Sequence, residues 1–327
     1  MNFLDKKVTF FCRSDIANLS NEFAKSLRAV GVAGAKAIQL TKTPTYVWPD
    51  HYMTPVVSPE DMRKIIEESD IICYMHSQTP GVGVPLADKK VMVFHGGTDY
   101  RKGSGHFNRM FNKVVDLTLI QTCGLFGKGA KAQTWMLPAI DTGYLKPRFN
   151  KTTDKIVIGH HPSGHGKGTG RIAEAIRIIK MFDHLNKRLE WRLDGGEVTW
   201  EKNIERMAEC DIYIESLAQD KIIGQRDDWS VQALEAAALG CVVVTNFECC
   251  ERYKVEYGEC GLQIANGQHE LFAIIKNLLE ISNDELYDLK LETRKWVEER
   301  HGLVATGKRF LEVIFPKLYK GEIDAQK

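Results

Sequence analysis

The stretch DDWSVQALEAAALGCVVVTN, residues 227–246, decides how the rest of the chain folds. Two acidic residues precede an alanine- and leucine-rich segment that stops at Gly240, which predicts a short helix whose N-terminus is favoured by the negative charge. Residues 241–244 then form a continuous apolar run, as expected of a strand buried on both faces of a parallel sheet. Glu235, eight positions after Asp227, is the lone acid of this helix. It is either a solvated surface carboxylate or part of a binding site.

Strand-like and helix-like segments alternate on both sides of this stretch, which predicts an α/β fold with parallel sheets covered by helices. The expected strands are 8–12, 35–40, 70–75, 91–94, 117–121, 134–137, 155–158, 189–193, 212–215, 241–244 and 261–264. The expected helices are 20–30, 59–69, 105–113, 171–182, 200–209, 269–280, 284–300 and 305–319. Ser20 and Ser58 are the predicted N-caps of the first two helices.

Composition limits the class of protein. A chain of 327 residues is long enough for two domains, and 44 Lys+Arg against 43 Asp+Glu give no overall basic field for a nucleic acid or an anionic membrane. A local basic patch stays open. We expect no integral membrane segment, because no apolar run approaches ~20 residues. The cysteines form no Cys-x-x-Cys pair and the first residues do not read as a signal peptide, so we expect a cytoplasmic protein.

Ligands of parallel sheets bind beyond the carboxyl ends of the strands, where two segments in the first part of the chain stand out. The first is residues 13–18, and the second is residues 95–101, which place His95, Asp99 and Arg101 around two glycines. This second segment is either a flexible turn with solvated charges or part of a site. A metal held by His95, Asp99 and His106 is disfavoured, because the spacing fits no regular motif.

A further segment, residues 159–170, is glycine-rich and lies between an expected strand and an expected helix. Such a loop favours a phosphate group, because backbone N–H groups and the helix dipole both attract an anion. Lys167 would add a positive charge, and Ser163 and Thr169 would add hydroxyl groups. The segment is neither a P-loop nor a Gly-x-Gly-x-x-Gly fingerprint, and a structural loop without a ligand remains the alternative.

From about residue 90 to 320 the chain resembles the retaining nucleotide-sugar glycosyltransferases of the GT-B fold, in the family often called group 1 or family 4. Four segments carry the resemblance in the family's order. They are FHGGTDYR at 94–101, the loop PAIDTGYLKP at 138–147, HHPS followed by KGT within 160–169, and the acidic pair Asp227/Glu235 with the EAAALGCVVV run after it. The first ~85 residues carry no comparable match.

This resemblance implies two Rossmann-like domains whose parallel sheets face each other across a cleft. Residues 1–148 would form the acceptor domain and 149–302 the donor domain, which binds the nucleotide sugar. Residues 303–327 would form a C-terminal helix that packs back on the first domain. Family members transfer the sugar with retention and need no metal, so no metal ligand and no cofactor is expected beyond the nucleotide-diphosphate sugar as co-substrate.

The resemblance also suggests residue roles. Lys167 would bind the donor diphosphate with Ser163, Gly168 and Thr169, and Glu235 would be ionised and hold the ribose. His160 stands where many members carry Arg. Asp227 occupies the position of the family's first glutamate, which holds the sugar hydroxyl groups, and Asp228 follows it in the donor site. Trp229 and Ser230 replace the family's usual aromatic–glycine pair. His95, Asp99 and Arg101 would serve the catalytic side of the reaction.

We therefore expect an enzyme, a hexosyl- or pentosyltransferase. Its acceptor is unidentified: a glycan, a lipid-linked intermediate, a small molecule, a protein or a modified nucleic-acid base, including a modified DNA base. The alternative is a non-catalytic nucleotide- or sugar-binding protein on the same fold. A Rossmann-type oxidoreductase is disfavoured, because its glycine fingerprint is missing.

Overall fold

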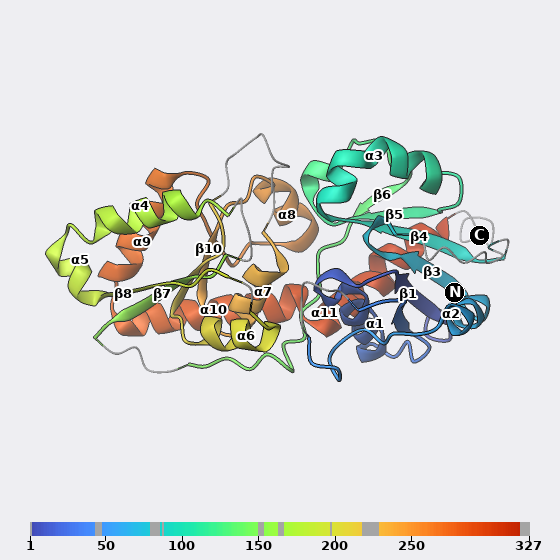
Figure 1. The fold of residues 1–327 in the computed structure, drawn as a ribbon, viewed down its shortest axis with the longest axis horizontal. Coiled ribbons are helices and arrows are strands. Elements are labelled where there is room, and N and C mark those ends of the chain that lie inside the picture. Colours follow the sequence, from blue (N-terminus) through green and yellow to red (C-terminus); the bar gives the residue numbers. More distant parts are fainter. Residues whose placement is uncertain are drawn as a thin grey trace. The chain divides into compact units, whose positions relative to one another are not determined.

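A computed structural model describes residues 2–42, 48–78, 86, 88–149, 154–162, 167–196, 198–217 and 229–320. The chain divides into two compact units (Figure 1). Unit 1 consists of Met1–Asp141 and His301–Lys327, and unit 2 of Thr142–Arg300. The division after Asp141 lies seven residues before the predicted boundary at residue 148.

Unit 1 is built on a parallel sheet of six strands in the order β2-β1-β3-β4-β5-β6. The strands are β1 (Val8–Cys12), β2 (Lys36–Gln39), β3 (Ile71–Tyr74), β4 (Lys90–His95), β5 (Leu117–Ile120) and β6 (Gln133–Trp135). β1 and β3 are buried along their whole length, as their continuous apolar sequences require. All six strands lie within two residues of the predicted ranges.

The first two helices of unit 1 begin in different ways. In α2 (Pro59–Glu67), the Ser58 side chain accepts a hydrogen bond from the Asp61 N–H, so this predicted cap is confirmed. α1 (Leu19–Ala29) begins one residue before Ser20, so the predicted Ser20 cap is wrong. The Asp15 carboxylate instead accepts the Ser20 N–H, at 3.0 Å for Oδ2. An acceptor five residues upstream thus replaces the expected hydroxyl.

The segment after β4 is mostly helical rather than a loop. α3 (Gly97–Phe111) begins directly after Gly96 and has non-helical angles at Gly103. Asp99 and Arg101 therefore lie in the first turns of a helix, and only His95 and Gly96 precede it. The paired glycines hid this start, because glycine is a poor helix former.

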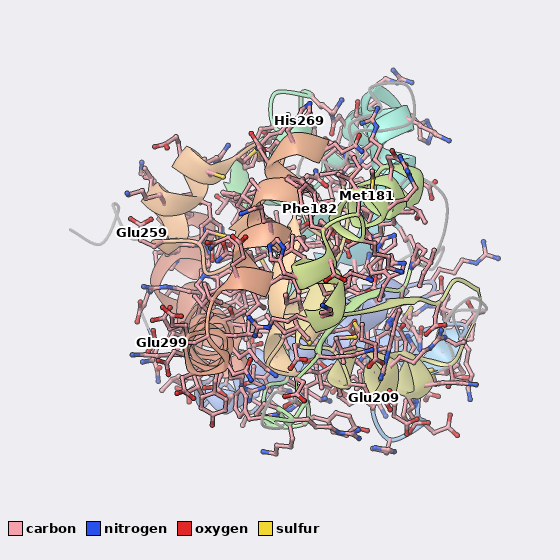
Figure 2. The ribbon with its side chains drawn as sticks, turned by 90° about the vertical axis from the view of Figure 1, so that its left-hand side faces the viewer. Met181, Phe182, Glu209, Glu259, His269 and Glu299 are labelled. Atoms are coloured by element: carbon pink, nitrogen blue, oxygen red, sulfur yellow. The ribbon has the colours of Figure 1, made fainter. Side chains whose placement is uncertain are left out.

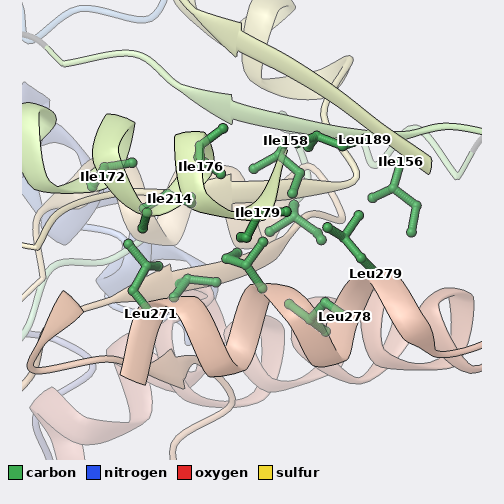
Figure 3. Close-up of a cluster of buried hydrophobic side chains, with 14 of the residues drawn as sticks. Ile156, Ile158, Ile172, Ile176, Ile179, Leu189, Ile214, Leu271, Leu278 and Leu279 are labelled. Carbon is green, nitrogen blue, oxygen red and sulfur yellow. The ribbon is translucent and has the colours of Figure 1, made fainter. Parts of the chain in front are cut away.

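Unit 2 is built on a parallel sheet of five strands in the order β11-β10-β9-β7-β8. The strands are β7 (Ile156–His160), β8 (Leu189–Leu193), β9 (Ile212–Ile214), β10 (Val242–Thr245) and β11 (Gln263–Ile264). The helices are α4 (Thr169–Ile179), α5 (Asp183–Arg188), α6 (Trp200–Ala208), α7 (Val231–Ala238), α8 (Cys250–Tyr257), α9 (Gln268–Glu280) and α10 (Asn283–His301). Figure 3 shows isoleucine and leucine side chains of α4 and α9 packed with those of the sheet into one core.

The sequence did not predict α5 and α8, because both are short and polar. Met181 and Phe182, in the turn between α4 and α5, are 73% and 42% exposed (Figure 2). The Phe182 ring still lies 6.1 Å from the Phe272 ring of α9, which anchors this turn.

The C-terminal helical segment belongs to unit 1. It consists of α11 (Leu303–Arg309), a π-helical turn (Phe310–Ile314) and α12 (Phe315–Leu318). α11 packs against α1, and the Phe310 ring lies 5.6 Å from Phe10 and 5.4 Å from Phe23. Phe310 is fully buried, so this segment forms part of the unit 1 core. None of the helices in the described ranges is long and apolar enough to cross a membrane.

Candidate functional site

A buried ion pair lies at the carboxyl edge of the unit 2 sheet. Lys167 precedes α4 and its ammonium group contacts the Glu215 carboxylate, which directly follows β9. The Ser230 hydroxyl, at the start of α7, donates to Glu215 Oε1 at 2.7 Å and accepts from Lys167 at 3.2 Å. Three elements distant in the sequence thus meet around one positive and one negative charge.

The second oxygen of Glu215 is also satisfied. The Thr245 hydroxyl, at the end of β10, lies 2.8 Å from Glu215 Oε2, and the Ser216 hydroxyl lies 2.7 Å from the same oxygen. Breaking a buried ion pair of this kind leaves an uncompensated charge, which makes loss of either partner strongly destabilising. The network therefore holds the Lys167 ammonium group in one place.

Gly168 fixes the backbone between Lys167 and α4. Its φ is +73°, and a Cβ there would lie 2.7 Å from the Leu217 carbonyl oxygen. The Leu217 N–H donates to the Lys167 carbonyl at 3.0 Å, so this segment rests on the end of β9. Only glycine combines this conformation with such a close approach. α4 consequently begins at Thr169, two residues after Lys167.

His160 is a neutral positioning residue. Nδ1 donates to the Ile214 carbonyl at 2.8 Å, and Nε2 lies 3.0 Å from the Thr169 hydroxyl, which donates to it. Burial lowers the pKa of His160 to about 4; the nearby Lys167 charge also lowers it, while the bond to Ile214 opposes the shift. His160 joins β7, β9 and α4, but it does not supply the positive charge that an arginine would.

Glu235 is buried on α7 and faces α6. Trp200 Nε1–H donates to its Oε1 at 2.7 Å, and the Trp200 ring stacks on Tyr144. Burial raises the pKa of Glu235 to about 7, with the Trp200 bond acting in the opposite direction. Burial thus opposes the ionised form of Glu235, which stays a prediction.

The remaining predicted donor residues divide into two groups. Trp229 is buried against the aromatic rings of Phe247, Tyr253 and Trp296, so its side chain belongs to the core. Ser163, Asp227 and Asp228 lie outside the described residues.

In unit 1, His95 ends β4 and is fully buried. Its Nδ1 lies 2.7 Å from the Ser77 hydroxyl, and its ring stacks on Tyr100 with centroids 3.9 Å apart. Burial lowers the pKa of His95 to about 3, so this imidazole is neutral. Its Nε2 is buried without a hydrogen-bond partner in the described part of the chain.

Asp99 and Arg101 point to different surroundings. Asp99 is exposed in the first turn of α3, whereas Arg101 is half-buried and donates to the Thr122 hydroxyl at 3.1 Å. His95, in contrast, faces Ser77 and Tyr100. The three predicted catalytic residues thus share one strand–helix junction but have different neighbours.

Sequence reasoning missed Glu215, Ser216 and Thr245, which complete the unit 2 network. The available signal was their position, because each lies at or directly after the end of a buried strand. Within the described ranges, no three His, Cys, Asp or Glu side chains gather in a way that could hold a metal ion.

No known family model matches this chain, and no curated protein matches it in sequence. Solved structures do resemble it over most of its length. An α-glucosyltransferase in complex with UDP-glucose and DNA containing an abasic site gives a TM-score of 0.62 at 13% identity, covering 94% of this chain and 98% of that chain. The Anabaena protein Alr3699/HepE, in complex with UDP and glucose, gives 0.61 at 12% identity, covering 95% and 99%.

A further α-glucosyltransferase structure, with UDP and a 13-mer DNA containing a HMU base, gives a TM-score of 0.63 at 12% identity, covering 94% of this chain and 99% of that chain. At this identity the likeness establishes the fold. The predicted α/β architecture of the GT-B glycosyltransferases, with two parallel-sheet units, is confirmed.

Proposed function

We propose that this chain is a glycosyltransferase that moves a sugar from a nucleotide-diphosphate donor to an acceptor, with retention of configuration. The observation that carries the proposal is the Lys167 ammonium group, fixed by Glu215 beside the N-terminus of α4. A helix N-terminus and a fixed cation together stabilise the diphosphate leaving group, whose charge grows as the glycosidic bond breaks.

UDP-glucose is the first donor to test, because the structural neighbours were solved with UDP, UDP-glucose or glucose. In this proposal Lys167, Gly168, Thr169 and Ser163 bind the diphosphate, and His160 positions Thr169. Glu235 holds the ribose. Asp227, Asp228 and Ser230 bind the sugar, and Trp229 belongs to the donor site through its place in the core beside Ser230.

The β4–α3 junction of unit 1 serves the acceptor side in this proposal. Asp99 and Arg101 contact the acceptor, and His95 acts as a positioning residue through Ser77. The proposal keeps a metal-independent reaction without a cofactor and a cytoplasmic location.

The acceptor is a glycan, a small molecule or a modified nucleic-acid base. A modified DNA base is supported by the two α-glucosyltransferase neighbours, whose structures contain DNA. Exposed Lys102 and Arg109 on α3, with Lys113 after it, supply a local basic group that a phosphate backbone would contact.

A panel of nucleotide sugars tests the proposal. The wild-type protein is incubated with each donor, alone and with glucose or a 13-mer DNA containing a HMU base, and released nucleoside diphosphate is measured. Release from at least one donor is expected, with an α-linked product by NMR when the donor is UDP-glucose. If no donor releases nucleoside diphosphate with any acceptor, the proposal that this chain is an enzyme is contradicted.

The alternative, a non-catalytic nucleotide- or sugar-binding protein, is favoured by two features. Glu215 already neutralises Lys167, and His160 is uncharged. Calorimetric binding of UDP without release from any donor of the panel would select this alternative.

A further inference from the structure

A carboxylate–imidazole pair lies at the carboxyl edge of the unit 1 sheet, and neither residue belongs to the segments that resemble the family. Asp15 follows β1 and His76 follows β3, the strand beside it. His76 Nε2 lies 2.9 Å from Asp15 Oδ1, and the two side chains are 7% and 1% exposed. The pair is therefore almost enclosed, and the imidazole is its more accessible member.

Asp15 is held firmly in place. Its Oδ2 accepts hydrogen bonds from the Ser20 N–H and the Thr54 hydroxyl, and its own N–H donates to the Gln39 side chain at 2.8 Å. An ionised carboxylate only accepts hydrogen bonds, so the proton of the His76–Asp15 bond belongs to His76 Nε2. In the neutral imidazole Nδ1 then carries a lone pair.

His76 Nδ1 makes no hydrogen bond among the described residues. All fully buried polar atoms without a partner are known there, and His76 Nδ1 is not among them, so this nitrogen is accessible to solvent. His76 also has φ +56° and Ser77 φ +61°, a conformation that costs a non-glycine residue roughly 1 kcal/mol or more. The fold thus accepts strain at two successive residues that present an oriented basic nitrogen.

The contrast with His95 shows which imidazole is available to a ligand. Ser77 joins the two, because it follows His76 in the chain and contacts His95 Nδ1. His95 is fully buried under Tyr100 and Phe111. His76 contacts the Phe94 ring edge-on, at an angle of 89° with centroids 6.2 Å apart.

We propose that His76, oriented by Asp15, accepts the proton of the attacking hydroxyl group; this inference rests on the proposed function. The acceptor O–H bond breaks and its proton moves to His76 Nδ1. The acceptor oxygen forms the new bond to the anomeric carbon. The bond from that carbon to the diphosphate oxygen breaks, and its electron pair leaves with the nucleoside diphosphate.

Chemical rescue of His76→Gly tests this role with water as the acceptor, so the natural acceptor need not be known. The readout is UDP released from UDP-glucose, beside the Kd of UDP by calorimetry. Removing a general base lowers turnover by about 10²–10⁴-fold. We expect such a loss, an unchanged Kd of UDP, and partial recovery of turnover with added imidazole. Glycine also relieves the strained φ, and His106→Ala, an exposed histidine of the same unit, is the control.

A purely structural His76 would give a different pattern, in which turnover and the unfolding temperature fall together and imidazole restores nothing. Wild-type turnover in His76→Gly would overturn the inference alone. Absence of nucleoside diphosphate release from the wild-type protein with every donor of the panel, with water and with each acceptor, would overturn the proposed function as well. If His76→Gly does not fold, His76→Gln, whose amide still donates to Asp15 but is not basic, must show the same loss of turnover.

Discussion

The carboxyl edge of the unit 2 sheet is organised around a buried cation, whereas that of unit 1 is organised around a buried carboxylate. In unit 2, Glu215 and Ser230 hold the Lys167 ammonium group beside a helix N-terminus. In unit 1, Asp15 holds the His76 imidazole, and His76 and Ser77 both have left-handed backbone angles. Both sheets are parallel, so the difference comes from the residues that follow the strands.

This difference separates two chemistries. A cation beside a helix N-terminus stabilises an anion such as a diphosphate, whereas a carboxylate-oriented imidazole accepts a hydrogen bond or a proton. The same kind of edge thus suits a leaving group in unit 2 and an attacking hydroxyl group in unit 1.

The largest expected effect on stability comes from breaking the unit 2 ion pair. Glu215→Ala leaves Lys167 buried without its counter-charge, so we expect a loss of about 3–5 kcal/mol in the free energy of unfolding, measured with urea. Glu174→Ala is the control, because the Glu174–Arg177 pair on α4 is exposed to solvent and screened. Equal stabilities of these two variants would show that Glu215 is not structurally important.

The next largest effect is on the pH dependence of stability, and it compares one buried glutamate of each unit. Burial raises the pKa of Glu235, and likewise that of Glu22 on α1, from 4.5 to about 7. The folded state therefore binds the proton more tightly than the unfolded state, and stability falls as pH rises from about 4.5 to about 7. Glu235→Gln should flatten this fall and raise stability at pH 8 by on the order of 2–3 kcal/mol.

Glu22→Gln should give a smaller gain, because it also removes the ion pair with Lys25, whereas Glu235 has a neutral hydrogen-bond partner in Trp200. Urea unfolding of both variants from pH 4.5 to pH 8 checks the order. A wild-type profile that rises across this window would contradict the raised pKa values.

A smaller effect concerns ribose binding by Glu235. A carboxylate accepts both ribose hydroxyl groups, so Glu235→Gln should weaken UDP binding by about 1–2 kcal/mol. Because the ionised form binds better, UDP affinity of the wild-type protein should rise as pH increases through about 7. The test compares UDP with its 2′,3′-dideoxy analogue, and a preference for UDP that survives in Glu235→Ala would assign Glu235 a structural role only.

The sequence predicted buried strands well because they are largely apolar runs, as in Val8–Cys12, which matches its predicted bounds. Leu189–Leu193 also matches its predicted bounds, although it contains Glu190 and Arg192. The prediction failed where polarity hid the pattern, as in α8, and where two glycines preceded a helix, as in α3. The Lys167–Glu215 and Asp15–His76 pairs were beyond reach for another reason. Their members lie 48 and 61 positions apart, and only the order of the strands brings them together.

The resemblance led to Lys167 and Glu235 but gave no reason to choose Glu215. An acidic residue at the end of a strand is common, and nothing in the sequence indicates that this one binds a lysine. His160 stands where many family members carry Arg, and its bonds to Ile214 and Thr169 give it a positioning contact rather than a charge. Positions can be predicted from such motifs, whereas protonation states depend on burial and partners that appear only in the folded chain.

The central claim, that Lys167 binds the donor diphosphate, is tested most directly by comparing UDP with uridine. Calorimetry gives the ratio of their Kd values in the wild-type protein, in Lys167→Met and in Lys180→Met, a control at the opposite end of α4. A charge-assisted bond contributes about 1.5–3 kcal/mol, so Lys167→Met should lose roughly tenfold to 150-fold of the preference for UDP, while Lys180→Met keeps it. An unchanged preference for UDP in a folded Lys167→Met variant would contradict the claim.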